Sequence, residues 1–345
     1  MCTLLLIFLN LVLLFFLLLR HYNRIQCFRM INGIIEFDRK VDGLPLTVLG
    51  ELTCLMTKYN MFCTKYNWNI FLVAVLMSYI SLQICSLLLW PPARFDFSIV
   101  VKYFFETPCV TEFVIFVTAY FYFHNLGSRF DMLNSLCKRL PDGLVTAADT
   151  PTQSEITHLI ENIRLLHAEL CELLRTFSLG YGVVMLFFFV FNFLDLLRNI
   201  YYLLHMSRYS SSKKSVNFSA LNIIMIVVFC SQHVIFVLIL LITVSWINTK
   251  KMKIVSFLRL IHISELPLDT KLQIKMFMNQ LPTFEWDQIT AYGFFPIDLR
   301  FVLSFLLLLT TTLATSVQMK ENPYVIKFND AYHSYLKFEY LDLHE

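Results

Sequence analysis

The sequence predicts an all-α integral membrane protein, in which several membrane-spanning helices form a bundle with a helical layer outside the membrane. Of its 345 residues, 57% are hydrophobic and only 15% are charged. A soluble domain could not bury that much apolar surface. Several segments are long and apolar enough to cross a hydrocarbon core of ~30 Å, namely residues 3–19, 68–90, 107–126, 177–197, 220–247 and 292–317.

The first two segments carry further signals. Residues 3–19 have no basic stretch before them and no small-residue cleavage site after them, so we predict a retained span rather than a cleaved signal. Residues 68–90 begin with Trp68 and end with Trp90. Tryptophan at both ends is typical of the aromatic belts at membrane–water interfaces.

The distribution of basic residues predicts the topology. The loops after the first, third and fifth spans hold most of the Lys and Arg, for example Arg20, Arg24, Arg29, Lys250, Lys251 and Lys253. By the positive-inside rule these loops are cytoplasmic, which places the C-terminus outside. An even number of spans then places Met1 outside as well, although it almost directly begins a span. We therefore expect a further span before this sequence.

The cytoplasmic loops contain helices of their own. The loop before the fourth span has apolar residues at alternating steps of four and three, the period of one helix face. These residues are Ile156, Ile160, Ile163, His167, Leu170 and Leu174. His167 within this stripe is predicted to be an interior histidine with satisfied hydrogen bonds.

Two shorter cytoplasmic helices are predicted around Pro267. The fifth span continues as a helix with an apolar face at Ile254, Phe257, Leu258 and Ile261. Pro267 ends it, and Asp269 can cap a second helix. The apolar face of that second helix is predicted at Leu272, Met276, Phe277 and Leu281, and a weaker stripe lies at Phe28, Ile31 and Ile35. We expect these helices to pack together as a cytoplasmic anchor.

The last span is unusually polar near one end. Its final turns carry Thr310, Thr311, Thr312, Thr315, Ser316 and Gln318. A span that only anchored the chain in lipid would not need these groups, whereas a span facing water, ions or other helices would. Thr311, Thr315 and Gln318 recur at steps of four and three, so their oxygens share one helix face. The alternative is that the hydroxyl groups allow close helix packing within lipid.

Three motifs near the end of the chain resemble those of a known family. Residues 311–319 keep the Thr and the Gln of a Thr-Tyr, five-residue, Gln-Phe signature, with Thr312 and Met319 in place of Tyr and Phe. Residues 277–281 match F-x-x-Q-L, and residues 290–298 match a T-A-x-G-F-F-x-h-D run, where h is hydrophobic. Over about residues 250–319 the chain resembles the insect gustatory receptors, seven-span chemoreceptors related to insect odorant receptors. Aligned with them from its C-terminal end, the chain is expected to supply spans two to seven, with the first span missing from this sequence.

The resemblance implies a tetrameric, ligand-gated, non-selective cation channel opened by a small-molecule tastant. The last span of each subunit would line one central pore. The implied pore-lining residues are Thr311, Thr315 and Gln318, with Leu313 and Val317 as apolar gate candidates. Gln318 would lie near the extracellular mouth.

The resemblance also implies where a ligand binds and which partners the chain has. Ligand binding is assigned to the outer halves of the other spans, where the polar residues are Gln83, Glu112, Asn192, Asp195 and Asn222. Partners are the tastant, identical or co-receptor subunits and membrane lipid, with no nucleic acid. The protein is predicted to lie in the plasma membrane. Its chain is predicted to divide into spans with cytoplasmic helices (1–249), anchor helices (250–291), the pore-lining span (292–319) and an extracellular tail (320–345).

The main alternative is a secondary membrane transporter. It would need charged or Gly/Pro-broken helices at mid-membrane in matching halves. Ser231, Gln232 and His233 are the one candidate of this kind, and His233 is more simply a hydrogen-bonded packing residue. Enzymatic activity is not predicted, because no set of His, Asp, Glu or Cys converges near an interface. The nine cysteines form no C-x-x-C pair, so no metal site or cofactor is predicted.

Overall fold

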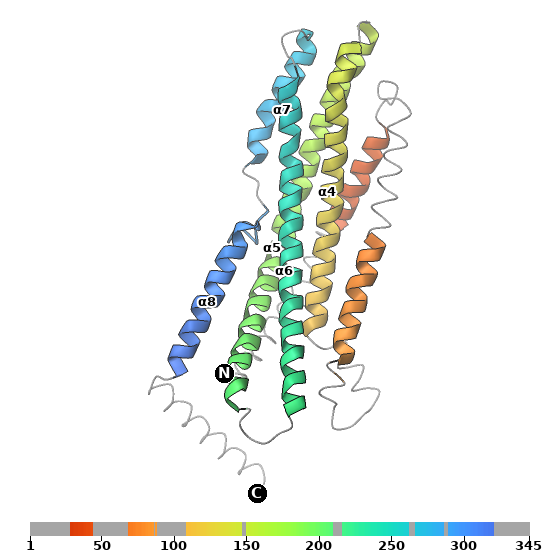
Figure 1. Ribbon diagram of the computed structural model, residues 1–345. Coiled ribbons are helices and arrows are strands. Elements are labelled where there is room, and N and C mark those ends of the chain that lie inside the picture. The colour runs from red at the N-terminus through yellow and green to blue at the C-terminus, as the bar shows by residue number, and fades with distance from the viewer. Residues whose placement is uncertain are drawn as a thin grey trace. The chain divides into compact units, whose positions relative to one another are not determined.

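The computed structural model confirms the all-α membrane fold class and describes most of the predicted helical segments (Figure 1). The described residues are 28–43, 68–85, 87, 108–146, 150–209, 216–261, 266–285 and 289–320. Their helices are 28–42, 68–85, α4 (Pro108–Thr146), α5 (Thr150–Tyr209), α6 (Val216–Leu260), α7 (Leu268–Glu285) and α8 (Arg300–Lys320). The predicted span at 3–19, the end of the span at 68–90 and the tail beyond 320 lie outside the described residues.

The central helices are longer than a membrane requires. α4, α5 and α6 have 39, 60 and 45 residues, whereas about 20 residues cross the hydrocarbon core. At 1.5 Å per residue, the 60 residues of α5 span about 90 Å. The predicted cytoplasmic stripe and the predicted span at 177–197 are therefore parts of one continuous helix.

Four of the described helices are long and apolar enough to cross a membrane. The apolar stretches are Trp68–Cys85, Ser154–Leu203, Ile223–Leu260 and Arg300–Gln318. α4 contains the predicted third span but is not among these four. Its stretch from 107 to 126 includes Glu112, His124 and Asn125, which lower its mean hydropathy.

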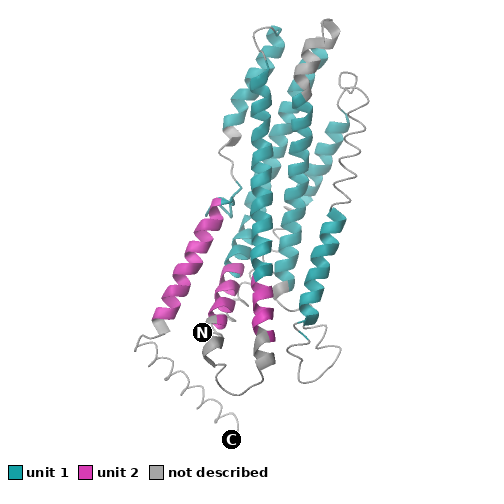
Figure 2. Ribbon diagram, viewed as in Figure 1, with its two compact units in different colours: residues 1–191, 231–299 teal, residues 192–230, 300–345 magenta. Residues whose placement is uncertain are grey.

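The chain divides into two compact units, coloured separately in Figure 2. Residues 1–191 and 231–299 form unit 1, and residues 192–230 and 300–345 form unit 2. The core of unit 1 contains the stripe predicted on α5, and each of its six residues is at most 2% exposed. The prediction for this helix face, including the buried His167, is confirmed.

The apolar face predicted for α7 is half wrong. The helix begins directly after Pro267 with Asp269 in its first turn, and Phe277 and Leu281 are buried as expected. Leu272 and Met276, however, are 55% and 42% exposed. The buried face runs instead through Thr270, Ile274, Phe277 and Leu281. The hydroxyl of Thr270 lies 2.7 Å from that of Thr157 on α5, so a polar contact that a count of apolar residues misses helps to set the rotation of α7.

The weak stripe predicted near the start of the chain is also on the wrong face. Phe28, Ile31 and Ile35 are exposed, whereas Met30 and Phe37 of the same helix are buried. Two long-range ion pairs hold this helix against α4 and α5 within unit 1. Asp38 accepts two hydrogen bonds from the guanidinium of Arg129 on α4, at 2.9 and 2.6 Å. Lys40 donates to Glu169 on α5 at 2.9 Å.

Unit 2 has a small apolar core of its own, formed by α8 and residues 192–230. Leu196, Phe305 and Leu309 are its buried members. The Phe193 and Phe305 rings meet edge to face, with centroids 5.6 Å apart. α8 begins at Arg300 rather than near 292, because residues 289–297 fold into a short hairpin.

Candidate conduction and ligand-binding sites

α8 has two opposite faces with different surroundings. Phe301, Phe305, Leu309 and Leu313 recur every four residues and pack in the core of unit 2. At 100° per residue, the opposite face carries Leu303, Leu307, Thr311, Ala314 and Gln318, all of them exposed. Leu303 and Leu307 are 73% and 68% exposed. In a membrane protein this second face must contact lipid, an aqueous path or another chain.

The hydroxyl groups of α8 direct their protons inward. The Thr311 hydroxyl donates to the Leu307 carbonyl at 3.0 Å, and the Thr315 hydroxyl donates to the Thr311 carbonyl at 2.8 Å. The same pattern holds for Thr310, Thr312 and Ser316. Because each proton is bonded within the helix, the remaining lone pairs of the exposed Thr oxygens point away from the helix axis. Such oxygens suit weak coordination of a cation.

The predicted pore residues do not all lie on the same face. Thr311, Thr315, Val317 and Gln318 are exposed. Leu313 instead packs against the core of unit 2. Of the two apolar gate candidates, Val317 is thus the one with its side chain outside that core.

The polar residues predicted to contact ligand also have different environments. Gln83, Glu112 and Asn192 are buried, at 3%, 4% and 0% exposure. Asp195 forms an ion pair with Arg198 one turn along α5 and accepts a hydrogen bond from Asn199 at 2.9 Å. The side chain of Asn222 lies outside the part of the chain that the structure describes.

A buried polar pair in unit 1 joins two residues that the sequence does not connect. Nδ1 of His233 on α6 lies 2.8 Å from Oε1 of Glu112 on α4, and both side chains are 4% exposed. The ring of Phe191 on α5 meets His233 edge-on, with centroids 6.4 Å apart. His233 is hydrogen-bonded, as predicted, but a separation of 121 residues gives no spacing signal for its partner. A buried carboxyl–imidazole pair within apolar helices can bind a polar group of a small ligand.

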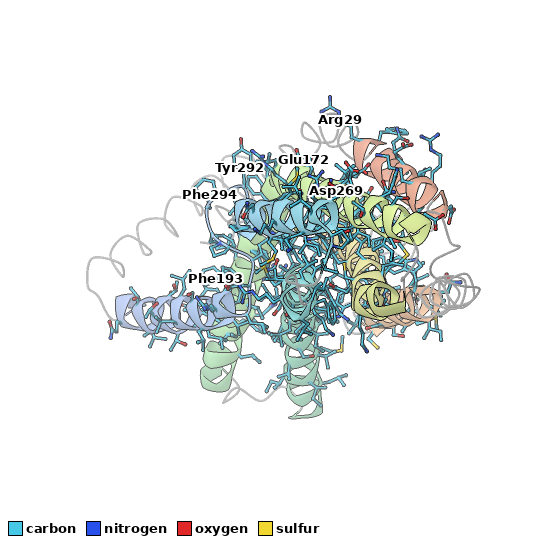
Figure 3. All side chains as sticks on the ribbon, turned by 90° about the horizontal axis from the view of Figure 1, so that it is seen from above. Arg29, Glu172, Phe193, Asp269, Tyr292 and Phe294 are labelled. Atoms are coloured by element: carbon cyan, nitrogen blue, oxygen red, sulfur yellow. The ribbon has the colours of Figure 1, made fainter. Side chains whose placement is uncertain are left out.

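The hairpin before α8 has a defined conformation. The amide of Ile297 donates to the Ile289 carbonyl at 2.8 Å, and the amide of Ala291 donates to the Phe295 carbonyl at 3.0 Å. Its tip has positive φ angles, 53° at Tyr292 and 79° at Gly293. Glycine tolerates this region, whereas a tyrosine there is strained. The side chains of Tyr292 and Phe294 point outward (Figure 3) and are 54% and 72% exposed.

Long apolar helices, a last helix with a polar face and a buried polar pair define a polytopic helical membrane protein. The chain belongs to the 7tm chemosensory receptor family, because residues 1–322 match the profile described as 7tm Chemosensory receptor. This match confirms the chemoreceptor resemblance predicted from the motifs between residues 250 and 319. Proteins of this family are receptors and not enzymes.

Solved structures with the same fold are those of an insect olfactory receptor. The structure of OR5 from Machilis hrabei in complex with eugenol has a TM-score of 0.52 and 12% sequence identity, covering 86% of this chain and 79% of that one. A second structure of that receptor has a TM-score of 0.51 and 11% identity, with coverages of 87% and 80%. At these identities the likeness shows the fold alone. No curated protein sequence matches the chain.

Proposed function

We propose that this chain is a subunit of a ligand-gated, non-selective cation channel opened by a small organic molecule, a tastant. The observation that carries the proposal is the asymmetry of α8. One face packs in the core of unit 2, and the other presents Thr311 and Gln318 with the Thr hydroxyl proton bonded internally. Membership of a chemosensory receptor family supports the same function.

A single α8 cannot enclose a conduction path, so the proposed channel is an assembly. Four subunits, either identical or paired with a co-receptor, would each contribute one α8 around a central axis. Gln318 would lie near the extracellular mouth, and Val317 would supply the apolar constriction that dewets in the closed state. The chain would lie in the plasma membrane, and the positive-inside pattern supports an extracellular C-terminus. Residues 250–291 would serve as the cytoplasmic anchor.

The ligand site is proposed among the buried polar residues of the outer helix halves and of the middle of α6. Glu112 and His233 would provide the polar contacts, with Phe191 nearby as an apolar wall. Gln83 and Asn192 are further candidates, because both are buried amides in the predicted outer helix halves. One receptor of the same fold has been solved in complex with eugenol, which supports testing that compound first.

Two adjacent threonines provide a matched test. Thr311 lies on the exposed face of α8, whereas Thr312 lies on the side of the packed face and is only half-buried. Each hydroxyl bonds a carbonyl of its own helix, so Thr311→Val and Thr312→Val remove the same chemistry. In receptors reconstituted into planar bilayers, Thr311→Val should change single-channel conductance or the Na⁺/K⁺ permeability ratio, and Thr312→Val should not. Equal effects of the two variants would remove α8 from the conduction path.

A further inference from the structure

The hairpin at residues 289–297 is bound to one face of α5 by a reciprocal hydrogen-bond pair. The hydroxyl oxygen of Ser178 accepts a hydrogen bond from the Thr290 amide at 3.0 Å. The same hydroxyl donates to the Thr290 carbonyl at 3.1 Å, and it lies 3.3 Å from the Thr290 hydroxyl. One serine thus satisfies both backbone polar groups of the residue at which the hairpin begins.

The next turn of α5 is shaped to receive the hairpin tip. A methyl group at Gly182 would lie 2.6 Å from the amide nitrogen of Tyr292 and 3.3 Å from the Thr290 carbonyl oxygen. Because both neighbours are backbone atoms, no side-chain rotation could relieve that contact. Three turns after Ser178, the Phe189 ring contacts Phe295 with centroids 5.9 Å apart. Positions 178, 182 and 189 share one helix face, so the hairpin lies along α5.

The hairpin is joined to α8 by a very short connection. Ile297 closes the hairpin, and α8 begins at Arg300, leaving only Asp298 and Leu299 between them. Two residues span at most about 7 Å, so the position of the hairpin restricts where α8 can start. α5 is itself continuous from Thr150 to Tyr209 and carries the ligand-site candidates Asn192 and Asp195 in its outer part.

We infer that Ser178 and Gly182 are positioning residues, which fix the start of α8 to α5 so that a movement of α5 is passed to the pore-lining helix. This inference rests on the proposed channel function. We call the contact of Ser178 and Gly182 with the hairpin the clamp. Within the hairpin, Tyr292 and Gly293 form a left-handed turn, and the Gly293 amide donates to the Thr290 hydroxyl at 3.0 Å. Since the clamp transmits motion, it stays closed while the channel opens.

The test uses two readouts in receptors that also carry Gln318→Cys. The first is the basal current of purified receptor in phosphatidylcholine bilayers, and the second is the rate at which the introduced thiol reacts with a membrane-impermeant cationic methanethiosulfonate. Ser178→Ala removes the hydrogen bonds to Thr290, and Gly182→Ala pushes the hairpin away from α5. Each variant should lower basal open probability at least about fivefold and should change the modification rate. Leu179→Ala is the matched control, because Leu179 is a neighbouring α5 residue that is 57% exposed.

A disulfide cross-link between the hairpin and α5 tests whether their contact stays intact, or must break, when the channel opens. Ser178→Cys with Thr290→Cys removes the hydrogen bonds, and oxidation with copper–phenanthroline joins the two sites covalently. For this comparison position 318 is kept as Gln, so that the oxidant has no reporter thiol to consume. The oxidised protein should recover the wild-type current, and dithiothreitol should abolish that recovery. Current lost on oxidation, or a modification rate unchanged in all the clamp variants, would overturn the inference. A wild-type receptor that passes no current would overturn the proposed channel function. The modification rate would still test whether the hairpin contact positions α8.

Discussion

Replacing His233 should destabilise the receptor more than replacing both members of its pair. The Glu112 and His233 side chains are each 4% exposed and 2.8 Å apart, so His233→Ala leaves a carboxyl group without its partner inside the helix bundle. Removing one partner of a buried pair typically costs about 3–5 kcal/mol, because the remaining group keeps its desolvation penalty. A second change, Glu112→Gln, replaces that carboxyl group by a neutral amide, and we expect it to recover about 2 kcal/mol of the loss.

The assay is a double-mutant cycle on detergent-solubilised receptor. Midpoints of thermal unfolding are compared for the wild type, Glu112→Gln, His233→Ala and the combined variant. Glu112→Gln alone should cost only about 1 kcal/mol, because an amide still hydrogen-bonds the imidazole. The expected order of stability is wild type, Glu112→Gln, the double variant and then His233→Ala. Additive losses would refute the pairing, since non-additivity is expected only for residues that interact.

The remaining predictions concern contacts within unit 1. Gly127→Ala should destabilise the fold by about 1–3 kcal/mol, because the added methyl group would overlap the Trp246 ring. The same thermal unfolding assay measures this loss. An unchanged unfolding midpoint would contradict the close contact between Gly127 and Trp246. Asp38→Asn should weaken the two hydrogen bonds with Arg129, whose side chain is 14% exposed, and so loosen helix 28–42. Faster proteolytic cleavage within this helix would show the loosening. Arg39→Gln is its control: that side chain is 76% exposed, so losing its Glu36 pair should have little effect. Equal proteolysis of the two variants would show that the Asp38 pair does not hold the helix.

Helix periodicity predicted some faces of the bundle well and others poorly. The α5 stripe from Ile156 to Leu174 was predictable because apolar side chains alone define it. The face of α7 was not, because the Thr157–Thr270 contact turns Leu272 toward the surface. Periodicity fixes which residues share a face, but the identity of the neighbouring helix decides whether that face is buried.

The candidate sites depended even more on contacts between distant residues. The sequence identified Glu112 and His233 separately, yet nothing in either segment indicates that they form a pair. Leu313 and Val317 looked equivalent as gate candidates, and only the contact with the core of unit 2 separates them. The motif at residues 290–298 was recognisable by resemblance, but its role as a hairpin bound to Ser178 is a tertiary property.

Charge substitution at Gln318 tests the proposal that the exposed face of α8 lines a cation path. Gln318 is exposed on that face. Fixed charge near a pore mouth changes the local concentration of permeant ions. We therefore predict that, in single-channel recordings at low ionic strength, Gln318→Glu raises cation conductance and Gln318→Lys lowers it severalfold. Both effects should weaken at high salt. Identical conductances for the wild type and both variants would contradict the account.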